Sequence, residues 1–144
     1  MKYVETRKAR PTDLRDIKRI ADGERNAFGF IPRAVIREAI RGGNLIVVTV
    51  DHRVVGFQHY YHRKRDLQTT LYHKAVLPDF RRQGLATRLV DAVVQEAREM
   101  RRKRLRLKCP VDLPANSFHC NYGFELVDRE RGKSRELNVW EYRL

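Results

Sequence analysis

The sequence has no apolar run of 18 or more residues and only two cysteines, Cys109 and Cys120. A transmembrane helix needs about 20 mostly apolar residues, so a membrane span is excluded. Two thiols are too few for a disulfide framework, and no histidine cluster stands beside them to suggest a zinc site. The first residues, Met1–Glu5, lack the apolar stretch of a secretory signal. We therefore expect a soluble cytoplasmic protein.

Internal repeats, Ser/Pro-rich linkers and low-complexity tracts are also absent from the 144 residues. A chain of this length points to one domain, which buries roughly 68–70% of the surface exposed by its unfolded chain. Apolar residues make up 42% of the sequence and charged residues 34%. This composition is too hydrophobic for a disordered chain and leaves enough apolar side chains for a core.

Basic residues are in excess, with 31 Lys and Arg against 18 Asp and Glu and a formal net charge of +13. Such a charge attracts anions, which include nucleotide cofactors, nucleic acids and acidic proteins. The alternative is that the charges are simply solvated, because the basic residues are spread along the whole chain. Only Arg101–Arg104 and His62–Arg65 form dense basic runs.

The spacing of apolar residues predicts a chain of alternating strands and helices. The first expected helix has Thr12 as its N-cap, and the second follows Pro32 and ends at Gly42. A third extends from about Leu85 to Arg102, and a fourth spans about Pro114–Asn121. The expected strands are Tyr3–Lys8, Leu45–Val50, Val54–Tyr61, Thr69–Val76, Leu105–Cys109, Phe124–Asp128 and Leu137–Arg143, with His62–Asp66 as a charged loop. A helix between two strands implies a parallel crossover in an otherwise antiparallel sheet, so the predicted fold class is mixed α/β.

The segment from Leu71 to Thr87 is the most informative for chemistry. An expected strand leads through a short loop containing Gly84 into the most regular amphipathic helix of the chain. The free N–H groups and partial positive charge of a helix start attract anions, and Gly84 lets the backbone approach a ligand closely. Arg81 and Arg82 add charge beside it. From the residues alone, this segment is either a phosphate site or an ordinary helix cap.

Four local patterns carry a resemblance to a known family. Arg81–Ala86 fits the signature Arg/Gln-x-x-Gly-x-Gly/Ala, and Ala75–Pro78 fits a strand ending in Val-x-Pro. Arg10–Leu14 and Gly123–Glu125 fit the beginning and the end of the same family's sequence pattern. With the order of elements, these features resemble the GCN5-related N-acetyltransferase (GNAT) family over nearly the whole chain. The resemblance implies a single domain over residues 1–144, with a mostly antiparallel sheet, one splayed parallel strand pair and helices on both faces.

The resemblance also implies acetyl-CoA as the cofactor, an amine of a small molecule or protein as the acceptor, and no metal. Acetyl transfer to a primary amine would then occur by direct attack in a ternary complex. Backbone N–H groups of residues 82–87 would bind the pyrophosphate, while the main chain of Val76 and Leu77 would bind the pantetheine arm. An N–H near Val76 would face the thioester oxygen. The implied cofactor-binding residues are Val76, Leu77, Arg81, Arg82, Gln83, Gly84, Leu85, Ala86 and Thr87.

The general acid is where the sequence departs from the family pattern. The family commonly places a Tyr beside the sulfur of coenzyme A, and counting back from Gly123 places His119 at that position. An imidazole titrates near neutral pH, so His119 is predicted to protonate the departing thiolate in place of the Tyr. The alternative is a surface residue that leaves this step to solvent. Cys120 is expected in the core rather than as a nucleophile.

The general base stays open, because the segment Thr69–Val76 contains no Asp or Glu and a base acting through water is equally compatible. The acceptor site is expected at about Glu24–Ile31, His59–Asp66 and Ser117–Asn121, as in the family. The side chains considered as base are His59, Tyr60, His62, Tyr72 and His73.

Two other functions remain compatible with the sequence, and a homodimer is possible. One is a basic nucleic-acid-associated protein, in which Tyr60, Tyr61 and Tyr72 would stack on bases, although no nucleic-acid-binding motif is present. The other is a coenzyme A-binding module of the same fold without activity, suggested by the missing Tyr.

Overall fold

The computed structural model describes residues 2–144. The chain folds into two compact units, of which unit 1 contains the residues up to Tyr60 and His73–Val93, and unit 2 contains Tyr61–Tyr72 and Val94–Leu144. The helices are α1 (Leu14–Gly23), α2 (Arg25–Phe28), α3 (Arg33–Arg41), α4 (Leu85–Glu99) and α5 (Ala115–Tyr122), with short 3-10 helices η1 (Pro11–Asp13) and η2 (Pro78–Phe80). The strands are β1 (Val4–Lys8), β2 (Leu45–Val50), β3 (Arg53–Arg63), β4 (Gln68–Val76), β5 (Arg104–Pro110), β6 (Glu125–Arg131) and β7 (Glu136–Arg143).

Antiparallel pairing in unit 1 follows from the short turn at Asp51–His52. β1 pairs with β2 from Val4 opposite Val50, and β2 pairs with β3 from Leu45 opposite His59. Asp51 and His52 both have positive φ, at 48° and 69°, as a two-residue hairpin turn of type I′ requires. The two strands predicted on either side of this turn are therefore joined as an antiparallel hairpin.

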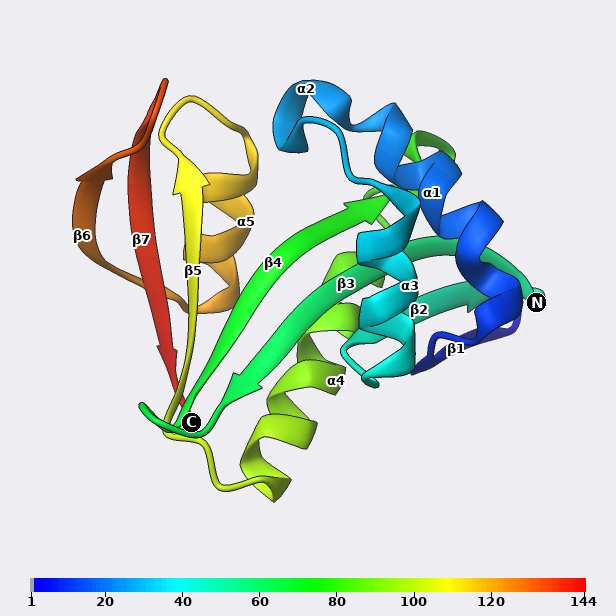
Figure 1. The fold of residues 1–144 in the computed structure, drawn as a ribbon, viewed down its shortest axis with the longest axis horizontal. Helices are drawn as coiled ribbons and strands as arrows, with labels where there is room; N and C mark the ends of the chain where they lie inside the picture. Colours follow the sequence, from blue (N-terminus) through cyan, green and yellow to red (C-terminus); the bar gives the residue numbers. More distant parts are fainter. Residues whose placement is uncertain (1) are drawn as a thin grey trace. The chain divides into compact units, whose positions relative to one another are not determined.

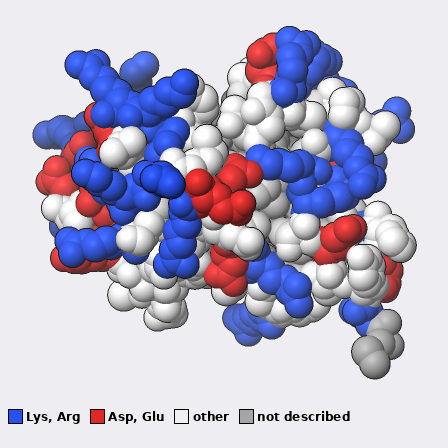
Figure 2. All heavy atoms as spheres, turned by 90° about the horizontal axis from the view of Figure 1, so that it is seen from below, with Lys and Arg blue, Asp and Glu red and all other residues white. Residues whose placement is uncertain are grey.

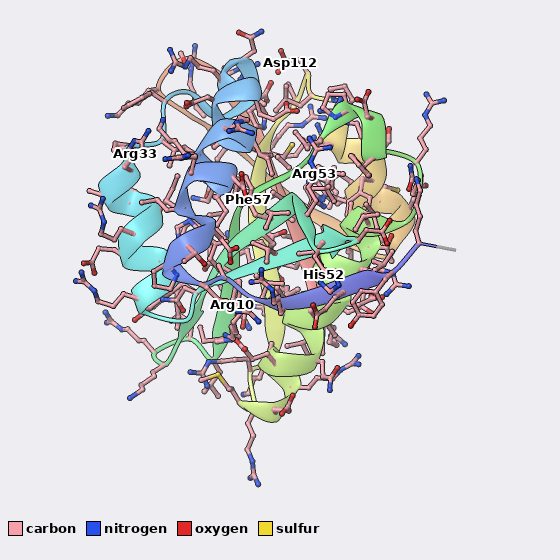
Figure 3. The ribbon with its side chains drawn as sticks, turned by 90° about the vertical axis from the view of Figure 1, so that its right-hand side faces the viewer. Arg10, Arg33, His52, Arg53, Phe57 and Asp112 are labelled. Atoms are coloured by element: carbon pink, nitrogen blue, oxygen red, sulfur yellow. The ribbon has the colours of Figure 1, made fainter. Side chains whose placement is uncertain are left out.

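The unit 1 sheet is covered on both faces, which explains why every residue of β2 is buried. α1 and α3 pack on one face, and α4 begins on the opposite face (Figure 1). Phe57, labelled in Figure 3, belongs to the core cluster under α1 and α3 and is 2% exposed. The other members of that cluster are Ile17, Ile20, Ala21, Ile31, Ile36, Ala39, Leu45, Val47, Val54 and Ala75.

Unit 2 is built on β5, which has β7 as an antiparallel neighbour from Arg104 opposite Arg143 to Pro110 opposite Leu137. β6 completes the hairpin with β7. The start of β4 pairs with β5 in parallel, from Gln68 opposite Arg104 to Thr70 opposite Arg106. This is the parallel strand pair that the sequence predicts, and its register covers only these three residues of each strand.

The predicted fold class is confirmed. Hydrogen bonding links the strands in the order β1-β2-β3-β4-β5-β7-β6, mostly antiparallel with β4 and β5 as the parallel pair. Within residues 2–144, no helix is both long and apolar enough to cross a membrane.

Three local predictions are wrong. Thr12 is not an N-cap, because it lies inside η1 and α1 starts at Leu14. The Asp13 carboxylate organises this start, accepting hydrogen bonds from the Arg10 N–H at 2.7 Å and from Arg7 at 2.8 Å. The connection after α1 contains the additional short helix α2. The segment His62–Asp66 is not all loop, because β3 continues to Arg63.

Candidate functional site

The end of β4 leaves one backbone donor at an unpaired edge. The Leu77 N–H donates to the Val55 carbonyl of β3 at 2.8 Å, so Leu77 faces β3. Successive residues of a strand direct their N–H groups to opposite edges, so the Val76 N–H faces away from β3. The register of β4 with β5 already ends at Thr70. The N–H of Val76 therefore points away from β3, whereas the N–H of Leu77 is used within the sheet.

Gly56 brings β3 against this end of β4. A Cβ at Gly56 would lie 3.0 Å from the Ala75 carbonyl oxygen and 3.1 Å from Val76 Cγ2. These distances are shorter than normal carbon contacts, so any side chain at this position would push β4 away. The absence of a side chain at Gly56 thus allows β3 to lie this close to Ala75 and Val76.

The loop between η2 and α4 turns sharply at two residues. Arg82 and Gly84 have positive φ, at 62° and 75°. The Arg88 N–H donates to the Gly84 carbonyl at 3.1 Å as the first helical bond of α4. The helix itself provides no acceptor for the N–H groups of residues 85–87, and its first turn contains no acidic residue. A helix start of this kind is suited to an anion, and a Cβ at Gly84 would meet no atom within 4 Å.

The two arginines of the loop have different surroundings. Arg81 Nε donates to the Val76 carbonyl at 3.1 Å, and Arg81 Nη2 forms an ion pair with Glu24. Arg81 therefore ties the residue after α1 to the end of β4, in addition to carrying charge. Arg82 is exposed and has no ion pair with an acidic side chain among the described residues. Its positive charge is thus available to an anion.

A further cation lies near this loop and was not predicted from the sequence. Arg53, labelled in Figure 3, places its guanidinium 5.6 Å from the centre of the Phe80 ring in η2. Lys2 Nζ lies 5.8 Å from the same ring. No motif marks Arg53, because only the packing of β3 beside β4 brings it to η2.

Two histidines and one phenylalanine meet on β3, β4 and α2. The ring of His73 lies 4.8 Å from that of Phe28 and 6.3 Å from that of His59, measured between centres. Burial lowers the pKa of His73 below its usual 6.5. Burial, and secondly the charge of a protonated His73, lowers the pKa of His59 to about 4. Both rings are therefore uncharged at neutral pH.

The structure separates the remaining base candidates. The Tyr60 hydroxyl is buried and accepts a hydrogen bond from Lys8 Nζ at 2.6 Å. His62 lies between Thr69 Oγ1 at 2.7 Å and Glu96 Oε2 at 2.6 Å. Thr69 is completely buried and the side chain of His62 is only 7% exposed, so the imidazole is closed to a substrate. These contacts give Tyr60 and His62 structural roles, whereas Tyr72 is 49% exposed.

His119, the predicted general acid, lies on the inner face of α5 and is 7% exposed. Its ring centre is 5.9 Å from that of Phe124 and 6.2 Å from that of Trp140. Cys120 was expected in the core, but it is exposed. The reason is helical geometry: the residue after an inward-facing His119 is rotated by about 100° toward solvent.

Asn116 holds α5 in place in unit 2. Its Nδ2 donates to the carbonyl of Pro110 at 2.8 Å, and its Oδ1 accepts from Trp140 Nε1 at 2.9 Å and from Asn138 at 3.1 Å. Its amide therefore joins the end of β5 to β7. This structural function was not predicted from the sequence.

The basic charge is distributed rather than concentrated on the face drawn in Figure 2. Lys and Arg side chains occur across that face, and Asp and Glu side chains lie among them. This distribution favours solvated charges over a single nucleic-acid-binding patch there. Among residues 2–144, no group of three or more His, Cys, Asp or Glu side chains is arranged to hold a metal ion.

Comparison with known proteins assigns the family. Residues 16–140 match the model of a family described as acetyltransferase (GNAT) domain, which covers most of the chain. This match confirms the resemblance found in the sequence. No curated protein matches the chain by sequence.

Solved structures with a similar fold include Ard1 from Thermoplasma volcanium, with a TM-score of 0.87, 25% identity, and coverage of 98% of this chain and 97% of that one. The ribosomal-protein-S18-alanine N-acetyltransferase from Escherichia coli has a TM-score of 0.82 and 18% identity, with coverage of 98% and 94%. The N-acetylglutamate synthase from Neisseria gonorrhoeae, complexed with coenzyme A and N-acetyl-glutamate, has a TM-score of 0.86 and 16% identity. The match covers 99% of this chain and 35% of that larger chain.

Proposed function

The chain belongs to the acetyltransferase (GNAT) domain family, and on this premise we propose that it is an N-acetyltransferase. In this proposal it transfers the acetyl group of acetyl-CoA to a primary amine by direct attack, as a single domain of 144 residues. The observation that carries the proposal is the loop from Arg82 into α4, which offers backbone donors and a free cation with no acidic residue in the first helical turn.

Acetyl-CoA is the cofactor that the family assignment supports, and the residues of unit 1 fit it. N–H groups from residue 82 to Thr87 would bind the pyrophosphate, with the side chain of Arg82 adding charge. The Val76 N–H would meet the pantetheine arm and donate to the thioester oxygen as negative charge develops there. The Leu77 N–H is bonded to Val55, so the contribution of Leu77 would come from its carbonyl.

Thermal unfolding with acetyl-CoA tests cofactor binding, and a panel of amines tests transfer. A ligand at 100 times its Kd adds about 2.7 kcal/mol of stability, which raises Tm by about 8–12 °C for a domain of this size. The panel contains glutamate, an alanine-initiated peptide and a lysine peptide with a blocked N-terminus, and release of free thiol is measured. A Tm that does not change on addition of acetyl-CoA would contradict the proposal. A Tm rise without acetyl transfer would show that the protein only binds coenzyme A.

The different surroundings of Arg81 and Arg82 lead to different expected effects. Arg81→Met removes the donor to Val76 and the partner of Glu24, so we expect acetyl-CoA binding about tenfold weaker and a loss of about 1–2 kcal/mol in unfolding free energy. Arg82→Met removes the same charge from an exposed side chain. We expect weaker binding with unchanged stability, and the loss should shrink as salt concentration rises.

Titration of acetyl-CoA in low and high salt, together with denaturant unfolding, measures both effects. Glu24→Gln is the matched control, because it breaks the ion pair but leaves Arg81 and its bond to Val76 in place. Equal stability losses for the two arginine variants would contradict the structural role of Arg81.

A further inference from the structure

His73 lies on the same strand end as Val76 and is packed between two other elements. Phe28 contacts its ring from α2, and His59 contacts it from β3. Phe28 and His59 come from two of the segments expected to form the acceptor site, and the structure brings these segments together at His73. The backbone is held as well, because Gln58 Nε2 donates to the His73 carbonyl at 3.3 Å.

The state of the His73 ring is unusual for a purely structural residue. Its Nδ1 is buried, and it has no hydrogen-bond partner within residues 2–144. Buried polar atoms are nearly always paired, so an unpaired one calls for an explanation by function. Burial disfavours the charged form of the ring, so the imidazole is neutral. A neutral imidazole carries one hydrogen, and with that hydrogen on the closed Nδ1 the other nitrogen, Nε2, holds the lone pair that can take a proton.

Neither β3 nor β4 contains an Asp or Glu, so imidazoles are the side chains these strands can offer as neutral bases. Three of them lie on these strands. His62 is bound to Thr69 and Glu96, and the pKa of His59 is about 4, which leaves His59 a very weak base. His73 is therefore the remaining histidine on these strands that could act as a base.

We propose that His73 is the general base of the acetyl transfer, with Phe28 and His59 as positioning residues for its ring. The proposal rests on the proposed acetyltransferase function. The acceptor ammonium gives one proton to Nε2 of His73, directly or through one water, and becomes a nucleophilic amine. The amine nitrogen then bonds to the thioester carbon while the carbon–sulfur bond breaks. The sulfur takes up one proton from a general acid or from solvent and the second amine proton is released to solvent, so the products are an amide and a free thiol, and His73 returns its proton to solvent.

The surroundings of His73 define the expected pH dependence. His59 is the titratable group that faces it from β3, and α2 contributes the uncharged ring of Phe28. The charged residue of α2, Arg25, lies over Phe30 instead. Because the neutral ring is the active form, protonation as the pH falls should remove the base. The turnover rate is thus expected to decline below an inflection that lies under pH 6.5, the usual pKa of histidine.

The test compares the full chain with His73→Gln, which has a similar size but cannot take the proton. His52→Gln is the matched control, because His52 is an exposed histidine of unit 1 in the β2–β3 turn. The probes are acetyl-CoA and whichever of the three panel amines the unmodified protein acetylates fastest. At pH 7 we expect H73Q to lower kcat by about 10²–10⁴-fold and to lose the acidic decline. H52Q should keep the kcat and the acidic decline of the unmodified protein. All three proteins should show the same Tm rise with acetyl-CoA.

Turnover of H73Q within about threefold of the unmodified protein, with the same acidic decline, would overturn the role of His73 and leave the acetyltransferase function intact. Failure of the unmodified protein to acetylate any of the three amines would overturn both. If H73Q does not fold, the pH profile of the unmodified protein decides: an inflection at or above 6.5 contradicts His73 as the base.

Discussion

Replacing Gly84 by glutamate is expected to abolish acetyl-CoA binding while the chain still folds. A Cβ at Gly84 meets no atom within 4 Å, so the side chain fits the folded protein. It would, however, place a carboxylate among the N–H groups that precede the first helical bond of α4, where the pyrophosphate is proposed to bind. We expect the affinity to fall more than about 100-fold, so that the Tm rise of about 8–12 °C disappears.

Gly29→Glu is the matched control for Gly84→Glu. Gly29 has φ of 76°, close to the 75° of Gly84, and a Cβ there also meets no atom within 4 Å. The ψ of Gly29 is −164°, a region that is almost restricted to glycine, so each substitution carries its own backbone penalty and each variant's Tm rise is measured from its own ligand-free Tm. Only the Gly84 variant should lose the response to acetyl-CoA. A full response in Gly84→Glu would exclude this loop as the cofactor site.

Replacing His119 by phenylalanine is expected to lower turnover about 10²-fold at saturating acetyl-CoA, if His119 protonates the thiolate. The aromatic neighbours Phe124 and Trp140 accept a ring of similar size, so the fold should be retained. Affinity for acetyl-CoA should change little, because the proposed cofactor loop lies elsewhere in the chain. Initial rates over a range of pH, with the Tm rise as a binding control, measure both quantities.

His119→Tyr separates proton donation from packing at the same position. A tyrosine stands at this position in the family pattern and carries a hydroxyl that can donate a proton, so this variant should keep most of the turnover that the phenylalanine variant loses. Equal rates for the phenylalanine, tyrosine and unmodified proteins would show that solvent protonates the sulfur.

Much of the fold could be predicted because its signals are local. The β-branched run Leu45–Val50 and the turn at Asp51–His52 define a hairpin within a few residues. The loop before α4 could also be predicted from a local signal, because Gly84 and the helix that follows it are adjacent in sequence. The family signature from Arg81 to Ala86 lies in the same stretch, and residues 16–140 match the family model.

The interactions that could not be predicted from the sequence connect distant residues. Arg81 pairs with Glu24, and Arg53 lies over the ring of Phe80. Arg81 was predicted only as a cofactor-binding residue, because its hydrogen bond to the Val76 carbonyl depends on how the loop turns back on the strand. The burial of His119 and the exposure of Cys120 likewise depend on the face that α5 presents to its sheet.

The sequence alone determined the family, the mixed α/β class and the position of the glycine-containing loop before α4, because periodicity and short motifs act over neighbouring residues. The tertiary structure decided the burial and the partners of several side chains that are equivalent in the sequence. His59, His62 and His73 cannot be ranked from the sequence, since each lies on or beside a strand of similar composition. Their burial and partners, which set proton affinity, arise only when separate elements pack together.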